Sequence, residues 1–211
     1  MGKTIMIGAM KGGVGKSVTA FNLAYSLQKC GKKVLAVDFD PQSNLTTCFG
    51  AEDVDVAIGD LMMAAILEPL KDDYDYILID TCPSLGALNI NAMAAADDVI
   101  VTVNPQLLAM MGIQDFLKTV KKIKGRINDR LNVSEILLTM CDARTILCKT
   151  ITEQVQETFQ RQIKIFNSKI PNTVKVGESV YYSEPLIEYA PESNVCRAYE
   201  KLAGEVIAYE G

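Results

Sequence analysis

A glycine-rich loop near the start of the chain constrains the fold more than any other feature. Residues 11–17 read Lys-Gly-Gly-Val-Gly-Lys-Ser, and an apolar stretch that includes Ile5 and Ile7 precedes them. A helical pattern of apolar residues follows from Ala20 to Leu27. A strand that leads through such a loop into a helix can direct backbone N–H groups at phosphate, while lysine contacts the terminal phosphates and serine ligates Mg²⁺. The sequence therefore predicts a nucleotide phosphate site; a purely structural strand-to-helix turn is the alternative.

One position of this loop departs from the usual phosphate-loop pattern. The pattern has glycine five residues before Gly15, whereas this chain has Met10 there, followed by an additional lysine, Lys11. Lys16 already supplies the phosphate contact that the pattern describes, so Lys11 needs a separate explanation. The residues expected to bind the nucleotide here are Lys11, Gly12, Gly13, Val14, Gly15, Lys16, Ser17 and Val18.

The composition excludes several classes of protein. The chain has 211 residues, of which 49% are hydrophobic and 22% charged, and this fits one domain over residues 1–211. Histidine is absent, which excludes histidine-based triads, and the six cysteines form no C-x-x-C pair and are expected to be free thiols. Neither a membrane-span-length apolar run nor a secretory pattern is evident, so we expect a cytoplasmic protein. With a net charge of −5, DNA contact would require a local basic patch or an oligomer.

Two further apolar strands are predicted to end in carboxylates. Residues 34–37 precede Asp38 and Asp40, and residues 76–79 precede Asp80. Because ligands of open α/β sheets bind at the carboxyl ends of the strands, all three carboxylates are expected beside the phosphate loop. Asp80 fits the Walker B carboxylate that holds Mg²⁺ in phosphate-loop proteins. A simple turn is the alternative for Asp38 and Asp40.

The remaining chain alternates strand-like and helix-like patterns. Repeated strand–helix units predict an α/β domain whose sheet is mostly parallel and doubly wound, with helices on both faces. The predicted strands are 99–103, 136–140 and 163–166, and the predicted helices are 55–70, 85–95, 113–127, one containing Ile151, Val155 and Phe159, and one that starts after Ser193.

Three motifs, in this order, resemble those of the ParA/MinD ATPases, which are P-loop NTPases. Residues 11–17 resemble the family's deviant Walker A loop, residues 38–44 its D-x-D-P-Q-x-N segment, and residues 80–84 its D-x-x-P-S segment. Further likeness at residues 139–145 and 170–175 favours the ParA/Soj branch of chromosome or plasmid partition proteins.

The resemblance implies ATP and Mg²⁺ as cofactors and explains the additional lysine. In this family the equivalent of Lys11 reaches across an ATP-sandwich homodimer to the phosphates of the other subunit. By the same resemblance, Lys16 contacts the β- and γ-phosphates and Asp40 positions the attacking water. Ser17 would ligate Mg²⁺, with Asp80 supporting it through water.

The resemblance implies three further roles. Asp38 would order the magnesium network. Adenine contacts would involve Pro171 and Asn172, although the basic residue usual in that loop is replaced here by Asn172. Hydrolysis would be slow without a partner, and a ParB-like activator would stimulate it.

DNA binding is implied at two basic positions, Arg144 and Lys175, which double to four in a dimer. The ATP-bound protein would then associate with the nucleoid. The alternative is that both residues are ordinary surface charges. Lys118, Lys122 and Arg126 offer another basic patch, for which a solvated helix face is the simpler interpretation.

Other functions remain open at this level. A MinD-like membrane-associated ATPase is the main alternative, but that branch ends in a basic amphipathic helix, whereas residues 205–211 are acidic. An iron–sulfur reductase would need paired cysteines, although Cys82 lies beside the predicted site, and an ATP-dependent ligase would need an acceptor pocket. The family usually has several dozen more residues between the helix near Leu61 and the strand at Tyr76, where residues 63–71 here connect the two almost directly. Either this member is shortened or the sequence omits a stretch.

Overall fold

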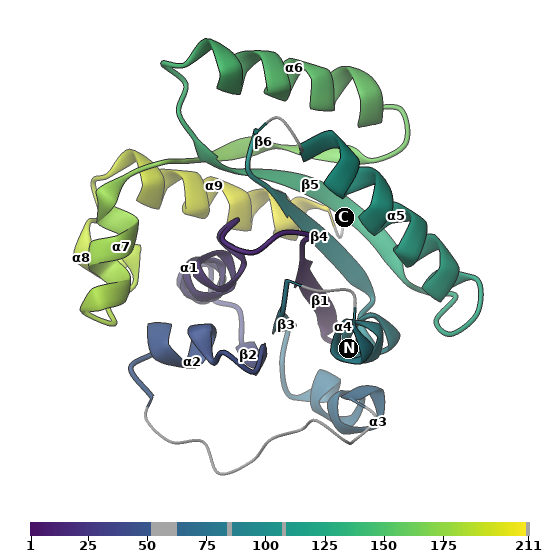
Figure 1. Ribbon diagram of the computed structural model, residues 1–211. Coiled ribbons are helices and arrows are strands. Elements are labelled where there is room, and N and C mark those ends of the chain that lie inside the picture. The colour runs from purple at the N-terminus through teal and green to yellow at the C-terminus, as the bar shows by residue number, and fades with distance from the viewer. Residues whose placement is uncertain (52–62, 84–85, 107–108, 210–211) are drawn as a thin grey trace.

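The computed structural model describes residues 1–51, 63–83, 86–106 and 109–209. Its strands form one six-stranded sheet in the order β2-β3-β1-β4-β5-β6, and each neighbouring pair is parallel. This confirms the predicted parallel α/β sheet (Figure 1). The strands are β1 (Lys3–Gly8), β2 (Val34–Phe39), β3 (Tyr76–Thr81), β4 (Asp98–Val103), β5 (Asn132–Cys141) and β6 (Lys164–Pro171).

The central position of β1 determines where a ligand can bind. The chain continues from β1 outward to β2, returns to β3 beside β1, and then builds β4, β5 and β6 on the other side. The loop that leaves the carboxyl end of β1 therefore lies at the point where the strand order reverses. Ligands of open α/β sheets bind in the crevice at such a switch point.

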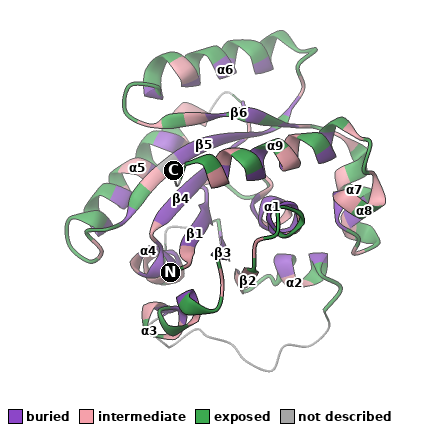
Figure 2. Ribbon diagram, turned by 180° about the vertical axis from the view of Figure 1, so that it is seen from behind, coloured by how far each residue is buried: buried purple, intermediate pink, exposed green. Residues whose placement is uncertain are grey.

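Helices cover both faces of the sheet, as predicted, and each face has its own apolar core (Figure 2). One core includes residues of α3 (Met63–Leu67), α4 (Ala87–Ala95), α5 (Ala109–Lys124) and α6 (Ile146–Phe159). The other includes residues of α1 (Lys16–Lys29), α2 (Asn44–Cys48), α8 (Leu186–Tyr189) and α9 (Asn194–Ala208). A further helix, α7 (Val174–Tyr181), follows β6.

Local sequence signals explain where α9 and α6 begin. Ser193 caps α9, its hydroxyl oxygen accepting a hydrogen bond from the Cys196 N–H at 3.2 Å. Thr145 caps α6 in the same way, accepting from Cys148 N–H at 3.3 Å. Such caps satisfy backbone donors that the first helical turn leaves free, so the predicted start of the final helix is confirmed.

Several predicted boundaries differ from the structure. Residues 55–62, half of the predicted helix at 55–70, lie outside the described residues; the described half contains α3 and the start of the short 3₁₀ helix η1 (Pro69–Asp72). Pro69 accounts for the break, because proline cannot donate the hydrogen bond that continues an α-helix. β6 runs on to Pro171 instead of ending near residue 166, and α5 begins at Ala109 instead of residue 113. The short helices α2, α7 and α8 were not predicted.

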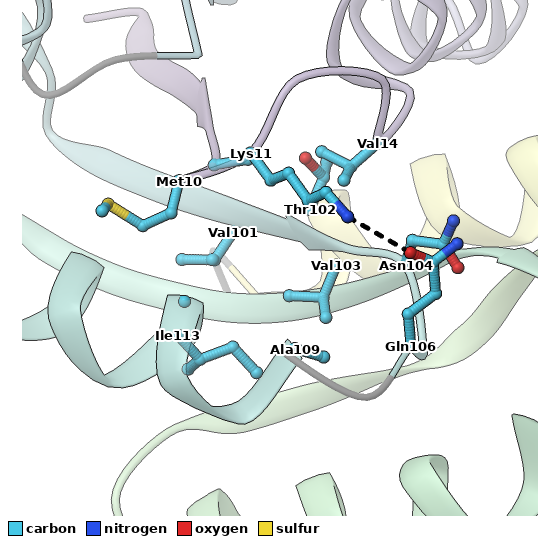
Figure 3. A pocket seen from close by; sticks show the side chains of 12 residues that line it. Met10, Lys11, Val14, Val101, Thr102, Val103, Asn104, Gln106, Ala109 and Ile113 are labelled. Atoms are coloured by element: carbon cyan, nitrogen blue, oxygen red, sulfur yellow. Dashed lines mark hydrogen bonds between the residues drawn. The ribbon is translucent and has the colours of Figure 1, made fainter. Parts of the chain in front are cut away.

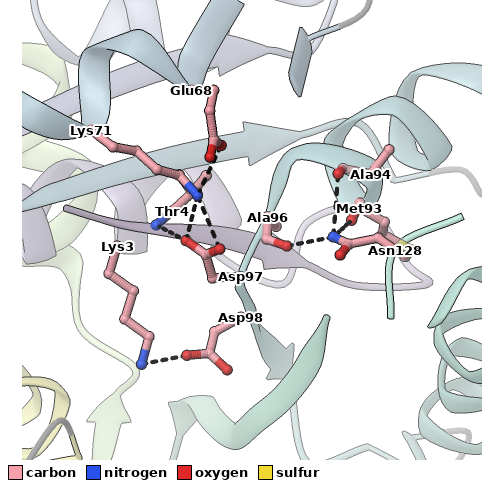
Figure 4. Close-up of polar contacts among 10 residues, drawn as sticks. All are labelled: Lys3, Thr4, Glu68, Lys71, Met93, Ala94, Ala96, Asp97, Asp98 and Asn128. Atoms are coloured by element: carbon pink, nitrogen blue, oxygen red, sulfur yellow. Dashed lines mark hydrogen bonds and ion pairs between the residues drawn. The ribbon is translucent and has the colours of Figure 1, made fainter. Parts of the chain in front are cut away.

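A polar network closes the amino-terminal edge of the sheet, opposite the loop (Figure 4). The Lys71 side chain is only 3% exposed, and its ammonium lies 2.9 Å from an Asp97 carboxylate oxygen. The same oxygen accepts a hydrogen bond from the backbone N–H of Thr4 at 2.9 Å. Asn128 donates to the carbonyl of Ala96 at 2.7 Å. These contacts fasten η1 and the α4–β4 connection to β1.

Candidate functional site

The loop after β1 has the conformation that its glycines predict. Gly13 and Gly15 have φ angles of 69° and 78°, in the left-handed region that other residues rarely adopt. Gly15 is the N-cap residue that directly precedes α1, and Gly12 lies against Pro83, two residues after β3. The backbone N–H groups of Gly15 and Lys16 donate to no acceptor among the described residues. Free donors at a helix N-terminus form a favourable environment for phosphate.

Asp80 provides a carboxylate directly beside this loop. It is fully buried at the end of β3, where Oδ1 accepts the N–H of Thr81 at 3.0 Å, while Oδ2 accepts no hydrogen bond from the described residues. Burial raises the pKa of Asp80 to about 6, and the nearby Ser17 hydroxyl and Lys16 ammonium oppose that rise in the pKa.

This environment fits a bound divalent cation. A buried carboxylate oxygen without a donor, next to a serine hydroxyl, supplies the hard oxygen ligands that Mg²⁺ prefers. Lys16 is also buried, and its positive charge acts on Asp80. The arrangement brings Lys16, Ser17 and Asp80 together as the sequence predicted.

Asp38 and Asp40 shape the adjoining β2–α2 connection. Asp38 Oδ1 accepts the Asp40 N–H at 3.1 Å, and Oδ2 accepts the Thr46 N–H at 2.8 Å and the Thr46 hydroxyl at 2.7 Å. Asp40 is largely buried and accepts the Gln42 N–H at 3.1 Å. The carboxylate of Asp38 thus ties α2 to the residue predicted to position water. Because both Asp38 oxygens already accept hydrogen bonds, the predicted role of Asp38 in the magnesium network stays a prediction.

Lys11 lies apart from the other charged residues of the loop. Its side chain is exposed, and its ammonium donates to Gln106 Oε1 at 3.4 Å (Figure 3). Gln106 belongs to the connection between β4 and α5, and a small apolar pocket lies beneath it, lined in part by Val103, Ala109 and Ile113. Lys11 therefore extends across the carboxyl edge of the sheet toward β4.

The other predicted ligand residues lie at the same edge, beyond β5 and β6. The Asn172 N–H donates to the Cys141 carbonyl at 3.0 Å, so Pro171 and Asn172 end β6 next to the end of β5. Asn172 also borders a shallow pocket with Val174 and Tyr181 of α7. This pocket is separate from the phosphate loop, and the adenine role of Pro171 and Asn172 stays a prediction.

The two predicted DNA-contacting residues follow the carboxyl ends of β5 and β6. Arg144 follows β5 and Lys175 lies in the first turn of α7, and both are exposed. Arg144 forms a bidentate ion pair with Asp142, with two N–O distances of 2.9 Å. Hydrogen bonds from the Arg144 side chain lower the pKa of Asp142 to about 2. The guanidinium is accessible, but in this conformation a carboxylate occupies its donors.

Two residues that the sequence analysis did not identify take part in these contacts. Thr46 holds Asp38 through both its backbone and its hydroxyl, and Gln106 holds Lys11. Thr46 lies eight residues after Asp38, and Gln106 lies 95 residues after Lys11. No spacing rule links such pairs, because the tertiary fold brings them together.

Comparison with known proteins identifies the family to which the chain is similar. Residues 5–186 match the CobQ/CobB/MinD/ParA nucleotide-binding domain family. The chain is 34% identical to the chromosome-partitioning ATPase Soj of Treponema pallidum over 253 aligned positions, which cover 100% of this chain and 99% of that protein. It is also 34% identical to the sporulation initiation inhibitor protein Soj of Bacillus subtilis, with 99% of each chain covered. An alignment of 253 positions against 211 residues agrees with a chain shorter than its relatives.

A solved structure extends the comparison to the fold. The septum site-determining protein MinD of Pyrococcus horikoshii, complexed with Mg-ADP, superposes with a TM-score of 0.82 at 24% identity, covering 100% of this chain and 98% of that one. Among the residues described here, no helix combines the length and the apolar composition of a membrane span.

Proposed function

Because the chain belongs to the CobQ/CobB/MinD/ParA nucleotide-binding family, we propose that it is a ParA-type partition ATPase. In this proposal it dimerises on ATP, binds DNA without sequence specificity, and is reset by Mg²⁺-dependent hydrolysis that a ParB-like protein stimulates. The observation that carries the proposal is the buried Asp80 oxygen without a donor beside the free N–H groups of the glycine loop. The full-length similarity to Soj proteins supports the partition branch.

In the proposed reaction each residue of the site has a distinct task. The backbone N–H groups from Gly13 to Ser17 and the Lys16 ammonium bind the β- and γ-phosphates. Ser17 would ligate Mg²⁺, with Asp80 supporting it through water, and the bound ion would neutralise charge at the phosphates. Asp40 positions the attacking water, and Asp38 keeps the Asp40 backbone in place through their hydrogen bond.

Lys11 is proposed to act in a second copy of the chain. Its exposed side chain and its position at the carboxyl edge are compatible with reaching a partner's nucleotide. A cation supplied by a partner acts like an arginine finger, which accelerates phosphoryl transfer roughly 10³- to 10⁵-fold where it has been measured. ATP would thereby serve both as substrate and as part of the dimer interface, and Lys11 would contribute to turnover only in the dimer.

The proposed DNA surface consists of Arg144 and Lys175 from both subunits. The chain carries a net charge of −5, so one subunit alone offers little attraction to DNA. A dimer doubles the local number of phosphate contacts, and affinity rises steeply with each phosphate that a cation neutralises. DNA binding would therefore depend on ATP, and the cytoplasmic protein would associate with the nucleoid only in its ATP-bound state.

The decisive experiment measures retention of plasmid DNA by the unmodified protein with Mg-ATP or Mg-ADP at two salt concentrations. We expect retention with ATP only, weakening at the higher salt. Liposomes of anionic lipid serve as the control. ATP-dependent binding to liposomes without DNA retention would contradict the partition function. It would favour the MinD-like alternative, whose fold this chain shares.

A second experiment tests the hydrolysis site. Asp40→Ala is expected to keep ATP binding and ATP-dependent dimerisation while losing turnover, whereas Lys16→Ala is expected to lose ATP binding. Sedimentation with nucleotide measures the first two properties and phosphate release measures the third. Normal hydrolysis by the Asp40→Ala protein would remove Asp40 from the mechanism.

A further inference from the structure

Thr139, near the end of β5, contacts the glycine loop through its side chain. Its side chain is buried, with the residue 2% exposed, and its hydroxyl donates to the backbone carbonyl of Val14 at 2.8 Å. The place where a Gly15 side chain would begin lies 3.9 Å from Thr139 Cβ, an ordinary van der Waals distance. Residues 125 positions apart in sequence thus meet in the middle of the loop.

The backbone of β5 is distorted at this point. Met140 has a φ angle of 52°, which is unusual for a residue with a side chain. Between Leu138 and Cys141, three steps along β5 correspond to two steps along β6, from Lys169 to Pro171. An additional residue in one strand is a β-bulge, a feature that redirects neighbouring side chains and is common beside active sites. The distortion therefore lies immediately after the residue that holds the loop.

The contact with Val14 determines the direction of the next backbone donor. The Val14–Gly15 peptide bond is trans, as are the other peptide bonds of the described chain. In a planar trans peptide, C=O and N–H point in opposite directions. With the Val14 carbonyl directed at Thr139, the Gly15 N–H must point to the opposite side of the loop. The Gly15 carbonyl is also held, because it accepts the Thr19 N–H at 2.9 Å.

Two other threonines at the same edge hold the strand rather than the loop. Thr81 donates to the Ile7 carbonyl at 2.9 Å and Thr102 to the Gly8 carbonyl at 3.4 Å. Both acceptors belong to β1. Of these three threonines, Thr139 is the one whose hydroxyl acts on the loop itself.

We propose that Thr139 is a positioning residue for nucleotide binding. It holds the Val14 carbonyl away from the phosphates and so keeps the Gly15 N–H directed at them. Without the hydroxyl, the buried Val14 carbonyl has no hydrogen-bond donor, which is unfavourable. Rotation of the Val14–Gly15 peptide toward another donor turns the Gly15 N–H away from the phosphates, so a phosphate contact is lost. This role rests on the proposed binding of ATP at the loop.

The test compares Thr139→Val, which removes the hydroxyl at nearly constant shape, with Thr139→Ser, which keeps it. Equilibrium titration with a fluorescent ATP analogue and Mg²⁺ is expected to give a dissociation constant about tenfold higher for Thr139→Val and within about threefold of the unmodified value for Thr139→Ser. KM for ATP should rise in parallel, while kcat at saturating ATP stays within about twofold. Thr152→Val is the matched control, because Thr152 is a buried threonine of α6 remote from the loop.

The outcomes separate this role from the proposed function. Equal affinity of the unmodified and Thr139→Val proteins overturns the role of Thr139 alone, as does an equal loss in Thr152→Val. An unmodified protein that binds no Mg-ATP overturns the proposed function and this role with it. Should Thr139→Val not fold, Thr139→Cys decides: its thiol is a weaker donor, so reduced affinity supports the role and unchanged affinity overturns it.

Discussion

Asp38 and Asp80 are register partners on the neighbouring strands β2 and β3, yet their carboxylates have opposite surroundings. Asp38 accepts three hydrogen bonds, whereas Asp80 Oδ2 accepts none from the described residues. The two carboxylates also repel each other, and the negative charge of Asp38 contributes to the raised pKa of Asp80. Both oxygens of Asp38 are thus held by the protein, whereas Oδ2 of Asp80 remains available to a ligand.

This difference predicts how stability without nucleotide depends on pH. The pKa of Asp80 is about 6 in the folded chain against 3.8 for an ordinary aspartate, so the folded state binds the proton more tightly. The contribution of Asp80 to stability is therefore fully present below about pH 4 and is lost as pH rises through about 6, by at most about 3 kcal/mol. Asp80→Asn should remove this pH dependence and raise the melting temperature of the nucleotide-free protein at pH 7.5. Calorimetry at pH 4.5 and 7.5 checks this, and identical pH dependence in both proteins would contradict it.

Thr46 is expected to affect turnover rather than binding. Thr46→Val removes the hydroxyl that donates to Asp38 and loosens the Asp40 backbone, so kcat should fall roughly tenfold to hundredfold while the dissociation constant for ATP stays nearly unchanged. Phosphate release and nucleotide titration measure the two quantities. Thr47→Val is the control, since the Thr47 hydroxyl donates to the Ser43 carbonyl instead. Equal turnover in both variants would show that Thr46 has no positioning role.

Lys71 is expected to stabilise the fold from the amino-terminal edge of the sheet. Lys71→Met leaves the partly buried Asp97 without its cation and should lower the free energy of unfolding by about 2–3 kcal/mol. Lys118→Met breaks the exposed pair with Asp115 and should change the same quantity by less than about 1 kcal/mol. Urea unfolding of both variants gives the comparison. Similar changes in the free energy of unfolding of the two variants would mean that burial of Lys71 adds nothing to stability.

Asp142 is expected to oppose DNA binding by Arg144. Asp142→Asn removes the carboxylate that occupies the guanidinium and one negative charge near the proposed DNA surface, so ATP-dependent DNA retention should persist to a higher salt concentration. Glu192→Gln is the control. Glu192 follows α8 and pairs with Arg197, so this variant makes the same change of charge elsewhere and is expected to have a smaller effect on DNA retention. Weaker retention by Asp142→Asn would indicate that Asp142 orients Arg144 for DNA instead of competing for it.

Much of the fold could be predicted because its signals are local. Continuous apolar runs identified the strands β1 to β4, and apolar residues at helical spacing identified α1, α6 and α9. The short helices α2 and α7 have too few turns for such a pattern, and the boundaries of β6 depend on pairing with β5, including its bulge. The motifs around Lys16, Asp40 and Asp80 were predicted to meet, since parallel strands present their carboxyl ends at one edge.

The amino-acid sequence by itself determined the phosphate loop, the order of the strands and the longer helices, and the carboxylates beside the loop. These depend on residue types at fixed short spacings, which act through local backbone preferences and apolar periodicity. Only the tertiary structure decided that both oxygens of Asp38 accept hydrogen bonds while Oδ2 of Asp80 accepts none from the described residues. It also decided that Lys11 donates to Gln106 and that Thr139 donates to Val14. Each of these depends on which side chain of a distant segment comes within hydrogen-bonding distance, and packing of the sheet and its helices sets that distance.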